Sequence, residues 1–398
     1  MNANISQLTK IAAKKSRLII GLMSGTSLDG LDIVLCRISE SGRSTKADML
    51  KFKTWVYPNS LKAKILRVFA KEAIDFQLLC ELNAEIGTLH GKLVSKSLEA
   101  WKLRPSQIDL IASHGQTVFH APRFLFPHSK VNSTLQIGDG DHLAVEAGII
   151  TVSDFRQKHI AKGGEGAPLA VYGDYLLFSK KGEDRIMLNA GGIGNFTLLP
   201  TSAKASEVFV TDTGPANTLI DQVIRKHLPN TFFDKDAGLA KKGTYNPSLL
   251  KALKANLFFK KPFPKTIGPE LFNLDYVEKA QQQSKTKSIS LEDLLATLTR
   301  FSAETMAEAI LNVIENKKSF KLFMSGGGAH NPLLVKWLKE LLPHVSFHKM
   351  IELGVSGDAK EALLFATLAN ETVAGGKIDF GFNSKVPTVS MGKISFPG

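Results

Sequence analysis

Cysteine is scarce in this chain, since only Cys36 and Cys80 occur among 398 residues. So few cysteines argue against a disulfide framework and indicate a reducing compartment, the cytoplasm. Long hydrophobic runs are also lacking, because no stretch approaches the roughly 18 apolar residues that span a bilayer. The sequence therefore predicts no membrane span. Its 43% hydrophobic and 22% charged content is typical of a globular protein.

The N-terminal residues lack the apolar segment of a signal peptide. Lys14, Lys15 and Arg17 make this region basic, and Gly21 and Ser24 interrupt the apolar run that follows. We therefore expect a short, disordered basic lead rather than a signal peptide.

Acidic residues are too few to balance the basic ones, which leaves a net charge of +13. The lysines are scattered in pairs such as Lys180-Lys181 and Lys260-Lys261, without a stripe of interleaved aromatic residues. This pattern favours a solvated lysine surface over a nucleic-acid interface. A positive field would speed the approach of anionic small molecules.

The chain is long enough for two domains, each with its own core. Helical spacing of apolar residues predicts a long helix over 76–100. Short apolar strands at 108–112, 135–137 and 149–152 each end in polar residues, where α/β folds place their ligands. Residues 185–199 start the same pattern again, so we expect two α/β domains with a boundary near 145–155.

The most informative segment is the stretch 21–32, rich in glycine, serine and aspartate. Apolar residues 18–20 and 33–35 flank it, which predicts a hairpin with a tight loop. Glycines let a ligand approach the backbone, and N–H groups with hydroxyls suit phosphate oxygens. The alternative is a turn without a ligand. The residues expected to bind phosphate here are Gly25, Thr26, Ser27, Leu28, Asp29, Gly30, Leu31 and Asp32.

Similar loops follow predicted strands in the second half of the chain. Phosphoryl transfer needs backbone donors, a divalent cation and a base, and glycine loops supply the donors. The residues expected at a nucleotide are Gly191, Gly192, Asn195, Gly214, Gly326, Gly327, Gly328 and Asn331. The candidate carboxylates for base or metal work are Asp29, Asp32, Asp212 and Glu361.

The order of these loops resembles that of the actin, Hsp70 and sugar kinase superfamily. The wording of residues 23–32, Met-Ser-Gly-Thr-Ser-Leu-Asp-Gly-Leu-Asp, is similar to one member family, the anhydro-N-acetylmuramic acid kinases. Residues 114–120, 135–139, 154–156, 163–169 and 212–215 resemble further motifs of that family. Two positions depart from it, because Glu165 replaces a glutamine and His159 stands where aspartate is frequent. These departures bear on fine substrate contacts rather than on the reaction.

The resemblance implies a two-domain actin-like ATPase fold of the ribonuclease H-like α/β class, with an active-site cleft between the domains. Residues 1–148 would form the first domain, completed by 370–398, and residues 149–369 the nucleotide-binding domain. It also implies ATP and Mg²⁺ as cofactors, a cytoplasmic location and the homodimer that the family often forms.

The resemblance further implies roles for single residues. Asp212 would be the catalytic base that activates water to open a 1,6-anhydro bridge, after which O6 takes the γ-phosphoryl group of ATP. Glu361 would be linked to the metal. The residues implied at the substrate are His114, Gln116, Thr117, Arg156 and Glu165.

The residues alone leave other roles open. Asp212 could cap the following helix, and Arg156 could pair with Asp154. Glu361 could simply interact favourably with the dipole at the N-terminus of its helix. Two other functions also stay open: a kinase of the same fold that acts on another sugar or small carboxylate, and a non-enzymatic nucleotide switch.

Overall fold

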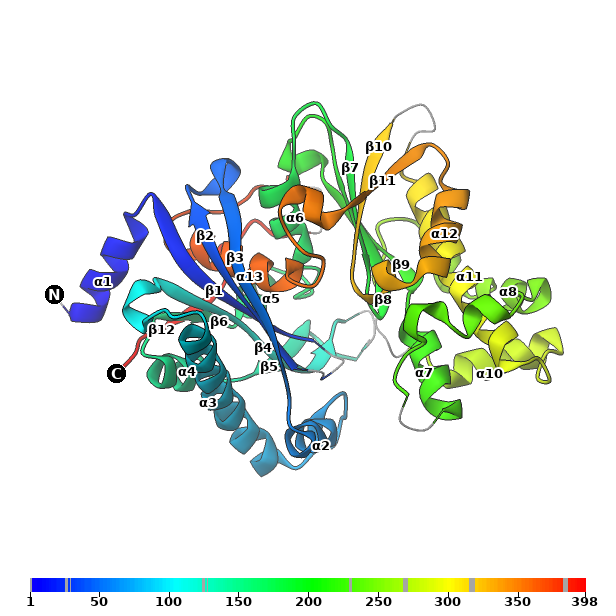
Figure 1. The fold of residues 1–398 in the computed structure, drawn as a ribbon, viewed down its shortest axis with the longest axis horizontal. Coiled ribbons are helices and arrows are strands. Elements are labelled where there is room, and N and C mark those ends of the chain that lie inside the picture. Colours follow the sequence, from blue (N-terminus) through cyan, green and yellow to red (C-terminus); the bar gives the residue numbers. More distant parts are fainter. Residues whose placement is uncertain are drawn as a thin grey trace. The chain divides into compact units, whose positions relative to one another are not determined.

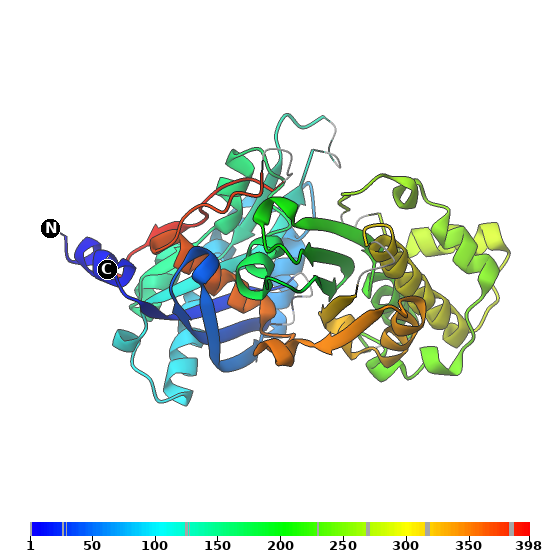
Figure 2. The same cartoon turned by 90° about the horizontal axis from the view of Figure 1, so that it is seen from above.

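The computed structural model describes residues 2–25, 28, 30–123, 126, 128–228, 231–267, 271–314, 319–381 and 386–398. The chain forms two compact units, drawn as ribbons in Figures 1 and 2. Unit 1 comprises Met1–Phe178 with Gly354–Gly398, and unit 2 comprises Ser179–Leu353. The expected boundary between residues 148 and 149 thus falls inside unit 1, and the chain returns to that unit at residue 354 rather than 370.

Unit 1 is built around one mixed sheet, ordered β12-β6-β4-β1-β2-β3 with β5 paired to β4. β1 and β2 form the predicted antiparallel hairpin, whereas β1, β4 and β6 run parallel. The C-terminal ends of these three parallel strands therefore lie at one edge of the sheet. The strands are β1 (Ser16–Ser24), β2 (Gly30–Ser39), β3 (Lys46–Val56), β4 (Leu110–Ala121), β5 (Ser133–Ile137), β6 (Thr151–Ser153) and β12 (Lys393–Ser395).

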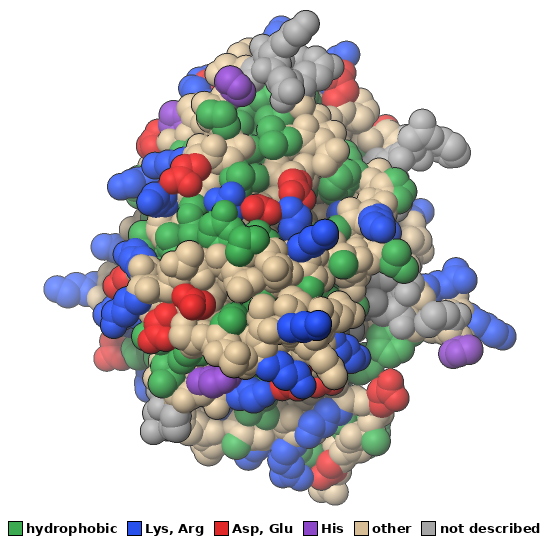
Figure 3. Space-filling view, turned by 90° about the vertical axis from the view of Figure 1, so that its right-hand side faces the viewer, with side chains coloured by type: hydrophobic (Ala, Val, Ile, Leu, Met, Phe, Trp, Pro, Cys, Tyr) green, Lys and Arg blue, Asp and Glu red, His purple; other side chains and the backbone are tan. Residues whose placement is uncertain are grey.

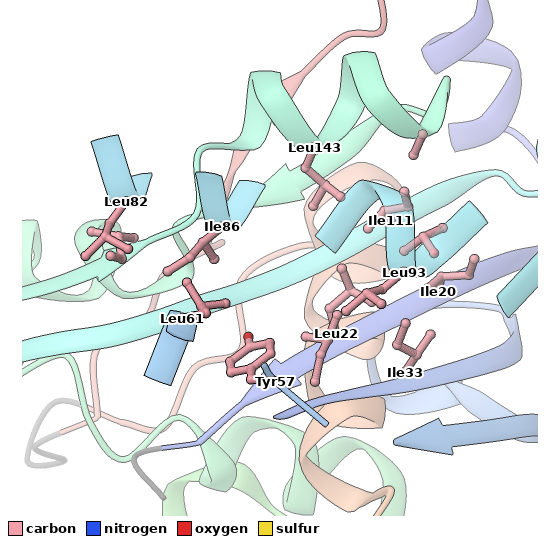
Figure 4. Close-up of a cluster of buried hydrophobic side chains, with 14 of the residues drawn as sticks. Ile20, Leu22, Ile33, Tyr57, Leu61, Leu82, Ile86, Leu93, Ile111 and Leu143 are labelled. Carbon is pink, nitrogen blue, oxygen red and sulfur yellow. The ribbon is translucent and has the colours of Figure 1, made fainter. Parts of the chain in front are cut away.

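Helices cover both faces of this sheet. On one face, α2, α3 and α4 contribute to a core that Figure 4 shows in part, with Ile20 and Leu22 of β1 beside Leu93 of α3. On the other face α13 packs closely, because a Cβ at Gly21 would lie 2.0 Å from the Ala362 carbonyl oxygen. The helices are α2 (Asn59–Val68), α3 (Phe76–Ala100), α4 (Gly140–Ala147), α5 (Phe155–Ala161), α6 (Ala170–Phe178) and α13 (Lys360–Val373).

The prediction of a disordered N-terminal lead is wrong. Ala3–Ala12 form helix α1, and the Asn2 side chain caps it by accepting hydrogen bonds from the Asn4 and Ile5 amides. Ile11 of this helix is buried, and the Asn4 side chain donates to the Pro397 carbonyl at 3.2 Å. These contacts hold a helix that basic composition alone does not indicate.

Unit 2 repeats the strand plan of unit 1. Its sheet is ordered β11-β10-β7-β8-β9. β7, β8 and β9 form an antiparallel meander, and β10 and β11 extend the sheet in parallel from β7. β7 to β11 thus correspond to β1, β2, β3, β4 and β6. The strands are β7 (Arg185–Ala190), β8 (Ile193–Leu199), β9 (Phe209–Pro215), β10 (Phe320–Ser325) and β11 (Val345–Lys349).

The long helix α11 joins the two cores of unit 2. Met306 and Ile310, in its C-terminal half, pack against the sheet, whereas Leu295 and Phe301, in its N-terminal half, pack against α7, α8 and α10. The Ser290 side chain caps α11 by accepting a hydrogen bond from the Asp293 amide. The helices are α7 (Thr218–His227), α8 (Pro247–Lys254), α9 (Leu257–Lys260), α10 (Leu274–Ser284), α11 (Leu291–Leu311) and α12 (Pro332–Leu341).

On the face drawn in Figure 3, lysine and arginine side chains are interspersed with acidic and apolar ones. Within the described ranges, no helix has both the length and the apolar character that a bilayer crossing requires. Cys36 is buried in β2 and Cys80 is exposed on α3, and both are free thiols.

Candidate functional site

In unit 1, side chains tie the C-terminal end of β1 and the residue after it to β4. The Ser24 hydroxyl donates to the Gly115 carbonyl at 3.0 Å, and the Gln116 amide donates to the Gly25 carbonyl at 3.2 Å. Both side chains are buried. Gln116, predicted to bind substrate, therefore holds Gly25, the start of the predicted phosphate-binding loop 25–32 (the first phosphate loop), against β4. Its Oε1 atom is buried without a partner among the described residues.

His114 and Arg156 form the centre of this edge of the sheet. Arg156 Nε and Nη2 lie 3.1 and 2.9 Å from His114 Nε2, and Arg156 Nη1 donates to the Gly166 carbonyl at 2.6 Å. The imidazole also packs against the ring of Phe365 on α13, with centroids 4.7 Å apart. These contacts join β4, the first turn of α5 and the loop at Gly166 to the last helix.

The protonation states follow from this geometry. Burial, followed by the charge of Arg156, holds the pKa of His114 well below its usual range. The imidazole is therefore neutral, and its Nε2 lone pair accepts from the guanidinium. Burial lowers the pKa of Arg156 to about 10 while Glu361 opposes that shift, so Arg156 remains charged at neutral pH.

Arg156 is not paired with Asp154, which was the other role open to it. Asp154 forms an ion pair with Lys393 of β12. A guanidinium has five N–H donors, and His114 and Gly166 take three of them. Among the described residues, one N–H on each terminal nitrogen thus remains available, which suits a carboxylate.

Two departures from the family pattern lie beside this arginine. His159 Nδ1 accepts a hydrogen bond from the Gly166 amide at 3.0 Å. An aspartate oxygen could accept the same bond, so His159 keeps the loop in place. Glu165 precedes Gly166 on this loop and is half-buried. Thr117 accepts from the Gln136 amide at 3.2 Å, which couples it to β5.

Two carboxylates lie within electrostatic range of each other in unit 1. Glu361 lies in the first turn of α13, and Asp32 lies on β2. Glu361 is exposed to solvent. Partial desolvation nonetheless raises its pKa against the opposing charges of Lys360 and Arg156, and the charge of Asp32 adds to the rise. The Asp32 carboxylate also accepts from the Thr54 hydroxyl at 2.5 Å. Two mutually repelling carboxylates suit a cation.

The donor set fits a magnesium ion that keeps most of its water. In the described part of the chain, no group of three or more His, Cys, Asp or Glu side chains could hold a metal. Mg²⁺ is usually bound by one or two carboxylates, with waters and substrate phosphates as the other ligands. Asp32 and Glu361 meet that requirement.

The first phosphate loop can be described only in part. Thr26, Ser27 and Asp29 lie outside the described residues. Leu28 and Leu31 have side chains buried in the core of unit 1, so only their backbone groups can meet a ligand. Leu28 has a φ of 59° in this turn, a conformation that costs a leucine of the order of 1 kcal/mol. Gly30 leaves no room for a side chain, because a Cβ would lie 2.1 Å from the Trp55 carbonyl oxygen.

A separate cavity of about 540 Å³ opens in unit 1 between α3, β5 and β12. Asn83, Asp139 and Ser395 are among its lining residues. His114 lines it, but Gln116, Thr117, Arg156 and Glu165 do not. The cavity is therefore distinct from the edge where the other predicted substrate residues gather.

The predicted nucleotide glycines of unit 2 fall into two kinds. A Cβ at Gly326 or Gly328 would lie 2.6 Å from the Asn189 side chain or 2.7 Å from Ala190 Cβ, so packing requires glycine there. Of the described residues, none would bring an atom closer than 3.4 Å to a Cβ at Gly191, Gly192 or Gly327. Packing against this described part of unit 2 does not require glycine at these three positions, so their bare backbones suit a ligand that approaches closely.

Asn217 joins the loops of unit 2, and the sequence analysis missed it. Its side-chain amide donates to the Ala190 and Gly191 carbonyls at 3.1 and 3.0 Å. The same nitrogen would lie 3.4 Å from a Cβ on Gly327. Asn217 therefore connects the β7–β8 turn, the start of α7 and the loop after β10. Its position two residues after the Thr-Gly-Pro turn was the signal that could have identified it.

Asp212 does not cap α7. It lies on β9 at a bulge, and α7 begins after Asn217. The Ile267 amide donates to Asp212 Oδ2 at 2.8 Å, and the Asp212 amide donates to the Lys265 carbonyl at 2.9 Å. Residues 265–267 thus fix one carboxylate oxygen. The side chain is half-buried.

The remaining predicted nucleotide residues have identifiable structural roles. Gly214 has a φ of 134°, which glycine adopts without strain. The Asn331 side chain caps α12 by accepting from the Leu333 and Leu334 amides. Asn195 lies opposite Asp212 in the β8–β9 pair.

The fold and these loops define the class of the protein. Each unit begins with a glycine-containing hairpin turn, and the same five-strand plan follows in both. This is the architecture of the nucleotide-binding actin, Hsp70 and sugar kinase superfamily, so the predicted α/β fold is confirmed. The family model for anhydro-N-acetylmuramic acid kinase matches residues 17–379. The chain belongs to the anhydro-N-acetylmuramic acid kinase family.

Full-length relatives support this assignment. The chain is 52% identical to the anhydro-N-acetylmuramic acid kinase of Pseudoalteromonas atlantica, with 100% of both chains covered. It is 48% identical to that of Pseudoalteromonas translucida, again over 100% of both chains. A solved structure, Acidaminococcus fermentans (R)-2-hydroxyglutaryl-CoA dehydratase component A, matches with a TM-score of 0.43 and 11% identity, over 90% of this chain and 99% of that one.

Proposed function

We propose that this chain converts 1,6-anhydro-N-acetylmuramic acid, ATP and water into N-acetylmuramic acid 6-phosphate and ADP. Water attacks C1 of the sugar and gives one proton to Asp212. The C1–O6 bond breaks, O6 bonds to the γ-phosphorus, and the bond from that phosphorus to ADP breaks. The proton on Asp212 then leaves to solvent. The reaction returns a fragment of peptidoglycan to metabolism.

The observation that carries this proposal is the environment of Asp212 in a member of this family. The Ile267 amide donates to Oδ2 at 2.8 Å, which fixes the direction of the half-buried carboxylate. A hydrogen bond from a backbone amide favours the ionised carboxylate, the form that a general base requires. One carboxylate suffices, because O6 carries its developing charge directly to phosphorus and needs no separate acid.

The nucleotide is assigned to the glycine loops. Gly191, Gly192 and Gly327 offer bare backbone, and Asn217 holds their loops together. We assign Mg²⁺ to Asp32 and Glu361. When bound, it neutralises charge on the β- and γ-phosphates.

The sugar acid is assigned to the edge of the sheet in unit 1. Arg156 presents two N–H groups to the lactyl carboxylate, and His114 and Gly166 set their direction. Gln116 and Thr117 line the β4 side of this edge, and Glu165 lies on the loop beside Arg156.

We place the reaction in the cytoplasm, where ATP is supplied and where free thiols such as Cys36 and Cys80 persist. No nucleic-acid partner is proposed, and the homodimer remains a prediction from the resemblance. Sedimentation of the purified chain would establish its oligomeric state.

Reaction in ¹⁸O-labelled water tests the proposal. The chain is incubated with ATP, Mg²⁺ and a panel of sugars, and ADP release is followed. Release should depend on the anhydro sugar, and the label should appear on the anomeric hydroxyl of the product and not in the phosphate ester. Short reaction times limit spontaneous exchange at C1. Label on the C6 oxygen would refute attack at C1, and equal turnover of an ordinary sugar would refute the substrate.

A further inference from the structure

Lys265 of unit 2 is a buried lysine enclosed by aromatic rings. Only 7% of the surface of this residue is exposed to solvent. The ammonium nitrogen lies 4.5 Å from the ring centroids of Phe258 and Phe263 and 5.8 Å from that of Phe259. It also donates to the Phe258 carbonyl at 3.2 Å. These groups belong to α9 and to the segment that follows it.

No acidic side chain pairs with this ammonium among the described residues. Burial lowers the pKa of Lys265, the more distant Glu308 opposes the shift and Lys261 adds to it. A buried charge without a counter-ion is costly. Contacts with the ring faces and the α9 carbonyl offset part of that cost. The ammonium therefore fixes the position of Lys265 relative to α9.

The backbone of the same residue is bonded to the strand that carries the base. The Lys265 amide donates to Thr211 Oγ1 at 3.0 Å, and the Lys265 carbonyl accepts from the Asp212 amide at 2.9 Å. Two residues further on, the Ile267 amide donates to Asp212 Oδ2 at 2.8 Å. The side chain of Lys265 thus holds one end of a segment whose backbone holds the carboxylate.

We propose that Lys265 is a positioning residue for Asp212. Its ammonium, held by the rings and the α9 carbonyl, anchors residues 265–267, and the Ile267 amide then orients the Asp212 carboxylate toward the attacking water. The inference rests on the proposed function, in which Asp212 is the base. Lys265 itself does not reach the reacting atoms, because its ammonium points into the ring cluster.

A variant that lacks the ammonium but keeps an apolar side chain of similar length tests this inference. Lys265→Met keeps the length of the stem and removes the charge and its donors. We expect kcat to fall about tenfold or more, since a small misplacement of a catalytic group is that costly, while KM for ATP stays within about twofold. The Ile267 amide should exchange with deuterium faster than in the wild type.

Two further variants serve as controls. Lys265→Arg keeps a cation with donors and should retain most of the wild-type kcat. Lys261→Met removes an exposed lysine from the same segment and should change neither kcat nor amide exchange. If Lys265→Met does not fold, Phe263→Leu weakens the same anchor by removing one ring face, and its kcat should fall without a change in KM for ATP.

The outcomes distinguish the positioning role of Lys265 from the role of Asp212 as the base. Wild-type kcat in Lys265→Met or Phe263→Leu overturns the positioning role. So does a loss that Lys265→Arg shares in full and that raises KM for ATP, because it indicates general damage. Retained activity in Asp212→Asn instead overturns Asp212 as the base, and with it the proposed mechanism.

Discussion

Two nitrogen atoms of the Arg156 guanidinium, Nε and Nη2, are directed at one atom, Nε2 of His114, at 3.1 and 2.9 Å. A protonated imidazole could not accept from a cation, so the pair requires neutral His114. Because Gly166 takes a bond from Nη1, the guanidinium is held at three of its five donors. The directions of the two that remain are thereby fixed.

Replacement of Arg156 by lysine should impair sugar binding selectively. An ammonium cannot present two parallel donors to a carboxylate, so Arg156→Lys should raise KM for the anhydro sugar by roughly 10- to 100-fold, the cost of about 1.5–3 kcal/mol for a charged hydrogen bond. KM for ATP should stay unchanged. Steady-state kinetics with each substrate varied in turn measures both. The control Arg37→Lys, at an exposed site on β2, should leave both constants as they are.

Asp212→Asn should abolish turnover and leave nucleotide binding intact. The amide keeps the size of the side chain and an acceptor for the Ile267 amide but cannot take a proton, and loss of a general base typically costs ~10² to 10⁴-fold in rate. Calorimetric titration with a non-hydrolysable ATP analogue should give the wild-type affinity. Asp275→Asn, at an exposed position of α10, is the matched control. More than about half of the wild-type rate in Asp212→Asn would refute the base assignment.

The two kinds of glycine in unit 2 should respond oppositely to alanine. A Cβ at Gly192 would lie 3.8 Å from Thr218 Cβ, which is an ordinary contact distance. Gly192→Ala should therefore keep the thermal stability of the wild type. Its KM for ATP should rise roughly tenfold or more, because a methyl group in a filled site costs about 1–3 kcal/mol. At Gly328 a Cβ would lie 2.7 Å from Ala190 Cβ, so Gly328→Ala should lower the melting temperature instead. Unchanged ATP kinetics in Gly192→Ala would remove that glycine from the nucleotide site.

Unit 1 should lose stability as the pH falls below about 6.5. The Tyr57 hydroxyl lies 2.6 Å from His90 Nε2, and burial lowers the pKa of His90 to about 3. Between these two pH values the unfolded chain binds the proton and the folded unit does not. Stability from this group is therefore complete above pH 6.5 and declines as the pH falls. At pH 5 the loss should be about 2 kcal/mol, from about 1.4 kcal/mol per pKa unit.

His90→Gln isolates this contribution, because the amide oxygen can accept from Tyr57 but does not titrate. Denaturation at pH 7.5 and pH 5 is followed by the fluorescence of Trp55 and Trp101, both in unit 1, with Trp337→Phe as the background. The pH dependence of the variant should be weaker by about 2 kcal/mol. Equal dependence in both proteins would show that His90 does not carry the effect.

The sequence predicts those parts of the fold that depend on local pattern. The hairpin around 21–32 and the helix over 76–100 follow from apolar spacing and turn residues, and both are confirmed. The domain boundary does not follow, because β6 and α13 join unit 1 through pairing and packing across long separations. The helix α1 was missed because its support comes from Pro397, at the other end of the chain.

The same distinction holds for the candidate site. Glycine-rich loops can be recognised from the amino-acid composition alone, so candidate nucleotide-binding residues could be named from the sequence. The roles of Asn217 and Lys265 depend on which carbonyls and rings lie near them, and no spacing in the sequence encodes that. For Gln116, burial beneath the first phosphate loop could not be inferred from the His-Gly-Gln-Thr wording alone.

The close packing of α13 on β1 at Gly21 has a consequence for the order in which the protein forms. Unit 2 is one continuous segment, residues 179–353, whereas unit 1 needs both ends of the chain. When residue 353 has emerged from the ribosome, all of unit 2 is available for folding. The helix α13, which covers one face of the sheet of unit 1, has not yet emerged. The second unit to be translated can therefore be the first to fold, and the N-terminal strands must wait, with that face uncovered, for the last 45 residues.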